Sequence, residues 1–268
     1  MPPITRQEFD LFLEDLTFRE VTIPSTGEIV EMPLTSRENT SMTAIHTVSR
    51  ERVLDLLPRP DLVPAELPEG RSIATVTAIE YANRNMDPYN EIIVGIPVAL
   101  GVGAAAPTVE SLLEPKLGGA VLFLRHLIVD TRLSEILGNE ILGYNKFISD
   151  IEFTETDTSR SVRVSEGGQD LFTLTVQVPA EVDHHDYDSD HNTVATLKNG
   201  KINLLTYPVA VEVPQPQPTQ ARLALGDHPL GRILADLEFS EEPLLIRFSR
   251  DWRLYSDERN LRTVDVVG

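Results

Sequence analysis

The sequence predicts a mainly β (α+β) protein made of antiparallel strands with a few short helices. Strand-length runs of alternating polar and apolar residues, separated by turn residues, recur along most of the 268 residues. Neither a βαβ alternation nor a sequence repeat is visible, which disfavours a parallel sheet. Hydrophobic residues make up 41% of the chain, enough for a sizeable core. So many strands have to close or stack in order to hide their edges.

In the first quarter of the chain, the sequence predicts two helices with strands between them. Residues 5–16 place apolar side chains at helical spacing, and residues 21–30 predict a β-hairpin with its turn at 25–27. Residues 41–49 alternate like a strand. Residues 50–57 predict a short helix that Pro58 ends, and a proline-punctuated loop follows at 59–70.

Strands dominate the remainder. The segment 131–143 is amphipathic at helical spacing, and Asn199-Gly200 marks a hairpin between 193–197 and 201–206. A short helix is expected at 229–237, and Trp252 is expected at a sheet edge. The other predicted strands are 72–81, 91–100, 120–129, 146–155, 161–165, 170–178, 222–225 and 244–248.

Composition excludes several classes of function. The net charge of −19 argues against binding nucleic acids or anionic lipid surfaces. There are no cysteines, so disulfides and thiol chemistry are excluded. No apolar run reaches the length of a membrane helix, and the N-terminus does not read as a signal peptide. We therefore expect a cytoplasmic protein. The acidic surface fits either a high-salt habitat or an arginine-rich genome.

Lys146 is the most informative residue. The chain has four lysines against nineteen arginines, and the other three lysines lie in predicted turns. An amine, unlike a guanidinium, can lose its proton and attack a carbonyl. On a continuous strand 146–155, however, Lys146 shares a face with Ile148, Asp150 and Glu152. That pattern favours a lysine that extends from the strand end to solvent.

The segments around Lys146 resemble the acetoacetate decarboxylase superfamily. Asp130, Gly138-Asn-Glu140 and Gly143-Tyr144-Asn-Lys146 are similar to its Schiff-base lysine segment. Asp87-Pro-Tyr-Asn-Glu91 is similar to its Tyr-x-Glu segment, and Ala221–His228 to its C-terminal strand and turn. The similarity runs in order from about Asn39 to Tyr255.

The resemblance implies an antiparallel sheet wrapped around a small β-barrel or cone that encloses the active site. It implies residues 1–35 as an N-terminal extension and 36–268 as the family domain. It assigns Lys146 as the imine-forming nucleophile and Glu91 as its acid/base partner. It further implies no cofactor, no metal and a homo-oligomer. Tyr144 lies two residues before the lysine, on the same strand face, so we expect it either to line the substrate pocket or to pack in the core with its hydroxyl at the rim.

Some family positions differ here. Phe147 stands where well-studied members carry a second lysine, so burial must do most to lower the pKa of the nucleophile. The family's carboxylate-binding arginine falls on Asn39, with Arg37 nearby, and its second active-site glutamate falls near Thr75. These differences put the carboxylate-binding half of the site in doubt.

Residues 181–192 form the other conspicuous cluster. His184, His185 and His191 with Asp186 or Asp188 could ligate a metal. No glycine shapes a rigid turn there, so we expect a solvated acidic loop.

We therefore expect a cofactor-independent Schiff-base enzyme acting on an oxo acid, with decarboxylation as the first choice. An aldolase-dehydratase or cyclase using the same lysine is the alternative. A non-catalytic protein that keeps the cavity for a small carbonyl or lipid-like ligand is a third possibility.

Overall fold

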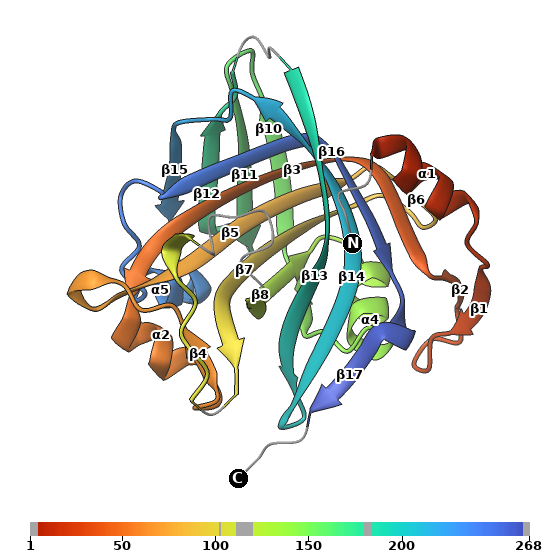
Figure 1. Cartoon of the computed structure of the whole chain (residues 1–268), viewed down its shortest axis with the longest axis horizontal. Coiled ribbons are helices and arrows are strands. Elements are labelled where there is room, and N and C mark those ends of the chain that lie inside the picture. The colour runs from red at the N-terminus through yellow and green to blue at the C-terminus, as the bar shows by residue number, and fades with distance from the viewer. Residues whose placement is uncertain (1–4, 102, 111–119, 180–183, 265–268) are drawn as a thin grey trace.

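The computed structural model describes residues 5–101, 103–110, 120–179 and 184–264 (Figure 1). Within these residues seven strands close a barrel in the order β7, β5, β3, β16, β14, β13 and β8, and β8 pairs back to β7. Their bounds are β3 Leu34–Ser49, β5 Arg71–Tyr81, β7 Tyr89–Leu100, β8 Val121–Val129, β13 His184–Lys198, β14 Lys201–Gln215 and β16 Leu245–Ser256.

Shorter strands extend the barrel wall, and a second sheet covers part of its outside. The four-stranded sheet is formed by β10 Asp150–Glu155, β11 Ser159–Glu166, β12 Gln169–Gln177 and β15 Ala221–Leu225. The strands added to the wall are β4 Leu62–Pro64, β6 Asn83–Arg84, β9 Lys146–Ile148 and β17 Leu261–Val264. Strands β1 Arg19–Thr22 and β2 Ile29–Met32 form a separate hairpin.

The helices of the described residues are short. They are α1 Arg6–Glu14, α2 Arg50–Leu56, α4 Arg132–Glu140 and α5 Pro229–Ala235, with 3₁₀ turns η1 Pro68–Gly70 and η3 Glu258–Asn260. Helices α1, α2 and α5 lie at the outside of the molecule (Figure 1). Helix α1 begins with a capping box, in which Thr5 and Glu8 satisfy each other's backbone N–H groups. Its buried Phe9 and Leu13 pack against Ala210 and Tyr255 of the barrel. No helix in the described residues is long and apolar enough to span a membrane.

Strand alternation divides the interior into two cores. One fills part of the barrel lumen and includes Ile79, Tyr81, Ile93 and Trp252. The other lies between the outside of the wall and the four-stranded sheet. Successive residues of a strand point to opposite faces, so each wall strand contributes to both cores.

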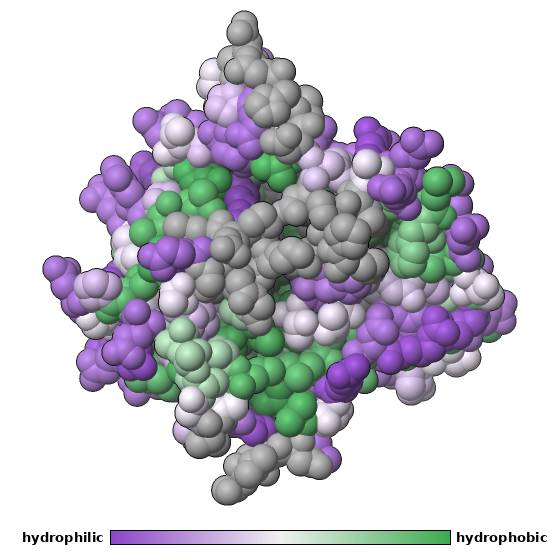
Figure 2. Space-filling model, in the orientation of Figure 1, coloured by the Kyte–Doolittle hydropathy of each residue, from purple (hydrophilic) through white to green (hydrophobic). Residues whose placement is uncertain are grey.

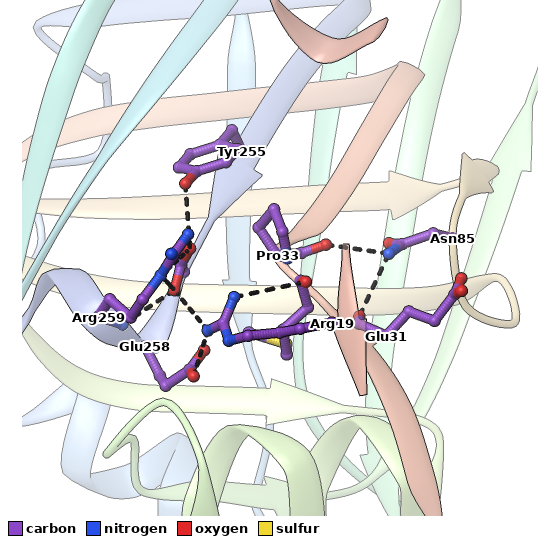
Figure 3. A network of polar contacts seen from close by, with 9 residues as sticks. Arg19, Glu31, Pro33, Asn85, Tyr255, Glu258 and Arg259 are labelled. Atoms are coloured by element: carbon purple, nitrogen blue, oxygen red, sulfur yellow. Dashed lines mark hydrogen bonds and ion pairs between the residues drawn. The ribbon is translucent and has the colours of Figure 1, made fainter. Parts of the chain in front are cut away.

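The hairpin β1–β2 covers the lumen end that holds Lys146. Ile23 and Met32 are buried in the lumen core. Arg19 donates to the Met32 carbonyl and forms ion pairs with Asp257 and Glu258, and Figure 3 shows this network. Asn85 donates to the carbonyls of Glu31 and Pro33 on the same hairpin (Figure 3). The ion pairs fix the hairpin to the residues that follow β16, and Asn85 fixes it to the segment that follows β6.

The predicted fold class is confirmed, and so is the hairpin at Asn199-Gly200, where both residues have positive φ. Six of the seven barrel pairings in the described residues are antiparallel. The β13–β8 pairing is parallel and joins only Val194 with Leu122 and Ala195 with Phe123. Strand β9 also pairs with β8 in parallel.

Several local predictions were wrong. The expected loop at 181–192 is strand from His184 onward, because the hairpin at Asn199-Gly200 propagates its pairing along all of β14. The side chains of His184, His185, Asp186 and Asp188 lie outside the described residues, as do residues 181–183. Trp252 is not at an edge, because β16 pairs with both β14 and β3. The loop 59–70 contains β4.

The predicted strand 146–155 is interrupted at Ser149. Strand β9 belongs to the barrel sheet, whereas β10 belongs to the four-stranded sheet. The face shared by Lys146 with Asp150 and Glu152 therefore does not exist. Lys146 is buried while Ile148 is exposed, so the prediction of a solvent-directed lysine was wrong.

Candidate active site

Lys146 reaches from the start of β9 into a small cavity inside the barrel. Its side chain is only 4% exposed. The cavity measures about 30 Å³, room for about two water molecules. Its lining is mostly aromatic and aliphatic and consists of Leu34, Tyr81, Met86, Tyr89, Glu91, Ser134, Leu137, Leu142, Tyr144, Lys146, Tyr207, Leu254 and Ser256. Lys146 is the only lysine or arginine among these described residues.

Helix α4 positions the lysine through two neighbouring residues. A Cβ atom built on Gly138 would lie 2.6 Å from both Cδ and Cε of Lys146, so only glycine leaves space for the lysine chain. The Asn139 amide accepts from the Lys146 backbone N–H at 2.6 Å and donates to the Lys146 carbonyl at 3.0 Å. The Gly-Asn pair thus aligns the lysine backbone and accommodates its side chain.

Glu91 is the direct partner of the lysine. Lys146 Nζ lies 2.6 Å from Glu91 Oε2, and both side chains are more than nine-tenths buried. Tyr81 donates to Oε1 and Tyr89 to Oε2, each at 3.3 Å. Ser134 Oγ accepts from Nζ at 3.3 Å. The ammonium and carboxylate are therefore hydrogen-bonded on several sides, as a buried ion pair requires.

A second contact ties the two motifs together. Asp130, at the end of β8, accepts from the backbone N–H of Asn90 at 2.8 Å and from its side-chain amide at 2.7 Å. Asn90 directly precedes Glu91 in β7. Because β7 pairs with β8 and β8 with β9, this contact helps hold Glu91 in register with Lys146.

Tyrosines supply most of the remaining polar groups. Lys146 Nζ lies 5.2 Å from the ring centre of Tyr89 and 5.5 Å from that of Tyr144. Burial, followed by the nearby tyrosine and Glu91 groups, raises the pKa of both Tyr144 and Tyr207. Both phenols therefore stay protonated at neutral pH and can donate hydrogen bonds to a bound oxygen.

The three residues predicted from sequence, Lys146, Glu91 and Tyr144, all line this cavity. Asn39 does not: its side chain is committed to the Trp252 carbonyl, Ser36 and the Ala82 N–H. Arg37 pairs with Asp10 near the surface. Thr75 donates to the Gly95 carbonyl in another part of the lumen. None of the lining residues in the described chain replaces the missing arginine.

Sequence reasoning missed Tyr81, Ser134 and Tyr207 as cavity residues. Tyr89 could have been found, because alternation in β7 puts it on the same face as Glu91. Tyr81 then follows from the pairing of β5 with β7, which sets it opposite Tyr89. Tyr207 lines the cavity only because the barrel closes, and no local sequence pattern predicts that closure.

The family model described as acetoacetate decarboxylase matches residues 21–238. The chain belongs to the acetoacetate decarboxylase family. No curated protein matches it at a significant level. Among the described residues, no group of three or more His, Asp and Glu side chains is arranged to hold a metal ion.

Solved structures of family members share the fold at low sequence identity. An acetoacetate decarboxylase is 12% identical with a TM-score of 0.65 over 98% of each chain. The acetoacetate decarboxylase from Legionella pneumophila is 12% identical with a TM-score of 0.61 over 87% of each chain. The enduracididine biosynthesis enzyme MppR, complexed with pyruvate, is 13% identical with a TM-score of 0.58, covering 92% of this chain and 98% of its own.

Proposed function

We propose that this protein is a Schiff-base enzyme that needs no cofactor and decarboxylates an oxo acid through an imine at Lys146. The observation that carries the proposal is the buried pair of Lys146 and Glu91, whose reactive atoms are 2.6 Å apart. A buried lysine is costly unless it is paired, and active sites are where such arrangements concentrate. Membership of the acetoacetate decarboxylase family supports the same chemistry.

In the proposed mechanism, Glu91 carries the protons that move during imine formation. Glu91 takes a proton from the Lys146 ammonium, and the free amine attacks the substrate ketone to form a carbinolamine. Loss of water, assisted by a proton from Glu91, gives the protonated imine. In a 3-oxo acid the carbon–carbon bond to the carboxylate then breaks, CO2 leaves, and the electron pair of that bond forms an enamine. Protonation at carbon and hydrolysis of the imine release the product and restore Lys146.

The absence of a second cation along the described cavity lining favours decarboxylation over the alternative. A carboxylate transferred into this aromatic cavity loses hydration, and its conversion to neutral CO2 relieves that cost. An aldolase-dehydratase has to keep the substrate carboxylate throughout the reaction. The alternative stays open because MppR, which shares the fold, is solved with pyruvate. A non-catalytic cavity protein is the third candidate.

Borohydride trapping tests the proposal. Incubation with acetoacetate or pyruvate followed by reduction should add substrate mass at Lys146 and not at Lys201. Lys146→Arg should abolish the label and Lys201→Arg should leave it unchanged. Release of CO2 identifies a decarboxylase, whereas an aldol product with an added aldehyde identifies the alternative. Absence of any label with a panel of oxo acids would overturn the imine mechanism.

Glu91→Gln separates proton transfer from lysine reactivity. The amide keeps the shape of the carboxylate but cannot ionise. Loss of general acid/base catalysis typically costs roughly 10²–10⁴ in rate, so turnover should fall on that scale. Trapping at Lys146 should persist, although more slowly. An unchanged turnover number, measured under saturating substrate, would exclude Glu91 as the proton carrier.

We also propose a homo-oligomer. The N-terminal helix and hairpin expose Leu11, Phe12, Phe18 and Ile29, each at least 39% accessible. Figure 2 shows hydrophobic side chains on the viewed surface at the side where α1 lies. Light scattering of the purified chain should give a multiple of 29.8 kDa, and Phe12→Glu with Leu11→Glu should lower it. A monomeric wild type would reject this proposal.

A further inference from the structure

The barrel lumen contains a second cavity that is much larger than the one at Lys146. Its volume is about 340 Å³, against about 30 Å³ for the lysine cavity. This size falls within the range of small-molecule binding sites. We name it the lumen chamber. Its wall includes Thr43, Thr75, Thr77, Ile93 and Val209, with one cation, Arg247, and one acid, Glu212, among the described lining residues.

The chamber exists because small side chains lie next to one another on neighbouring strands. Thr43 of β3 pairs with Thr77 of β5, and their hydroxyls hydrogen-bond to each other at 2.9 Å. Thr75 donates to the Gly95 carbonyl at 3.4 Å. The hydroxyls are satisfied within the wall, so these threonines contribute little free polarity to the chamber. Small side chains at these positions leave space inside the barrel that larger residues would occupy.

A single layer of side chains separates the chamber from the lysine cavity. Tyr207 lines both cavities. Ile79 lines the chamber and lies opposite Glu91 in the β5–β7 register. Trp252 lines the chamber, and its ring packs edge-on against Tyr81 of the lysine cavity, with 5.6 Å between ring centres. The reactive pair and the chamber are therefore neighbours within one lumen.

We propose that the lumen chamber holds the apolar tail of an elongated oxo acid whose carbonyl reacts with Lys146. This inference rests on the proposed function. The lysine cavity has space for a reacting carbonyl group and little more, whereas the chamber has space for a chain of several carbons. Its threonine methyls, isoleucines and valines suit an unbranched or aromatic hydrocarbon tail. Movement of Tyr207, the side chain common to both cavities, connects the two spaces when substrate binds.

Chain-length dependence tests the inference. The value of kcat/KM should rise at least about tenfold from acetoacetate to 3-oxooctanoate, since even one of the four added methylenes is worth roughly tenfold when it is buried in an apolar pocket. Thr77→Leu narrows the chamber and should reduce this rise while trapping of acetoacetate at Lys146 persists. Thr206→Leu is the matched control. In the wild type, the Thr206 hydroxyl hydrogen-bonds to that of Thr193 at 2.9 Å, the same distance as between Thr43 and Thr77, but neither Thr193 nor Thr206 lines the chamber.

Ligand entry can be measured without catalysis. Trp252 is the sole tryptophan of the chain and lines the chamber. Octanoate has no ketone and cannot form the imine. It should change the Trp252 fluorescence saturably in the wild type and in Thr206→Leu, and only at higher octanoate concentrations in Thr77→Leu. If no oxo acid labels Lys146 yet octanoate binds, the proposed function fails and the chamber stands. A flat length series together with no octanoate signal would overturn the chamber proposal.

Discussion

Gly138 shows how one residue without a side chain determines where a reactive group can lie. Helix α4 runs beside the start of β9, and the carbon chain of Lys146 passes directly over Gly138. Any side chain at this position would compete with the lysine for the same space. The Gly-Asn-Glu segment that resembles the family motif therefore has a steric basis at its first residue and a hydrogen-bonding basis at Asn139.

Gly138→Ala should reduce lysine reactivity more than stability. The added methyl lies 2.6 Å from Lys146 Cδ and Cε, so the lysine has to leave its contact with Glu91. Alanine favours helix by about 1 kcal/mol over glycine, which offsets part of the strain. Borohydride labelling should fall at least about tenfold while circular dichroism stays native. Arg132→Ala, on the exposed start of α4, serves as the control. Equal labelling of both variants would contradict the steric argument.

At the residue scale, sequence reasoning found the site through segments rather than through isolated residues. Lys146 and Glu91 were reached because each lies in a segment that resembles the family, and the structure brings them to 2.6 Å. Their catalytic roles stay predictions. The alternation of polar and apolar residues around Lys146 predicted a solvent-directed lysine. That prediction was wrong because it assumed an unbroken strand. Ser134 and Tyr207 could not be predicted, since their positions depend on how α4 and β14 pack around the lumen.

The short strand β9 is the element that separates the two cores at the site. Lys146 points into the lumen, whereas Phe147 packs in the outer core, with its ring against His126 at 6.1 Å between ring centres. A second cation at position 147 would therefore lie outside the lysine cavity. Phe147 therefore has a packing role, and we do not expect a lysine at this position to assist the nucleophile electrostatically.

Phe147→Lys and Ile148→Lys form a matched pair on this element. Phe147 is half-buried against the outer core, so its replacement should lower the free energy of unfolding by roughly 1–3 kcal/mol. Ile148 is 39% exposed, and its replacement should change stability by less than about 0.5 kcal/mol. Urea denaturation measures both. Phe147→Lys should not speed imine formation; a faster reaction would restore the electrostatic role.

At the scale of the whole molecule, the barrel was anticipated only through the resemblance. Alternation and turn residues predicted most strands and the hairpin at Asn199-Gly200. They could not predict the order of strands in the sheet, because pairing partners lie far apart in sequence. They also missed the strand character of 184–192, where an acidic composition is overridden by pairing with β14.

Two cores on either side of one wall leave polar groups of that wall without water. His126 is 7% exposed, and its Nε2 has no hydrogen-bond partner in the described residues. Burial, assisted by the charge of Arg125, lowers the pKa of His126 to about 4. The unfolded chain takes up a proton near pH 6.5 and the folded chain only near pH 4. Stability linked to His126 is therefore intact above pH 6.5 and lost as the pH falls toward 4.

His126→Gln should remove this pH dependence. Between pH 7 and pH 4, the free energy of unfolding should fall by about 3 kcal/mol more in the wild type than in the variant. Other titrating groups, including the buried His46, remain in both proteins and cancel in the difference. Denaturant unfolding of both proteins across this range provides the measurement. Parallel pH profiles would show that His126 is protonated as readily in the folded chain as in the unfolded one.

The pairing of β3 with β16 has a consequence for synthesis of the chain. Leu245 of β16 pairs with Ile45 of β3, which lies 200 residues earlier in the chain. Strand β16 also closes the barrel by pairing with β14. At ribosomal rates of 5–20 residues per second, β3 waits roughly ten to forty seconds before this partner is translated. During that time its edge offers open N–H and C=O groups to any other strand. Nascent chains that stall before residue 245 should therefore associate with one another or with chaperones, whereas the released full-length chain should not.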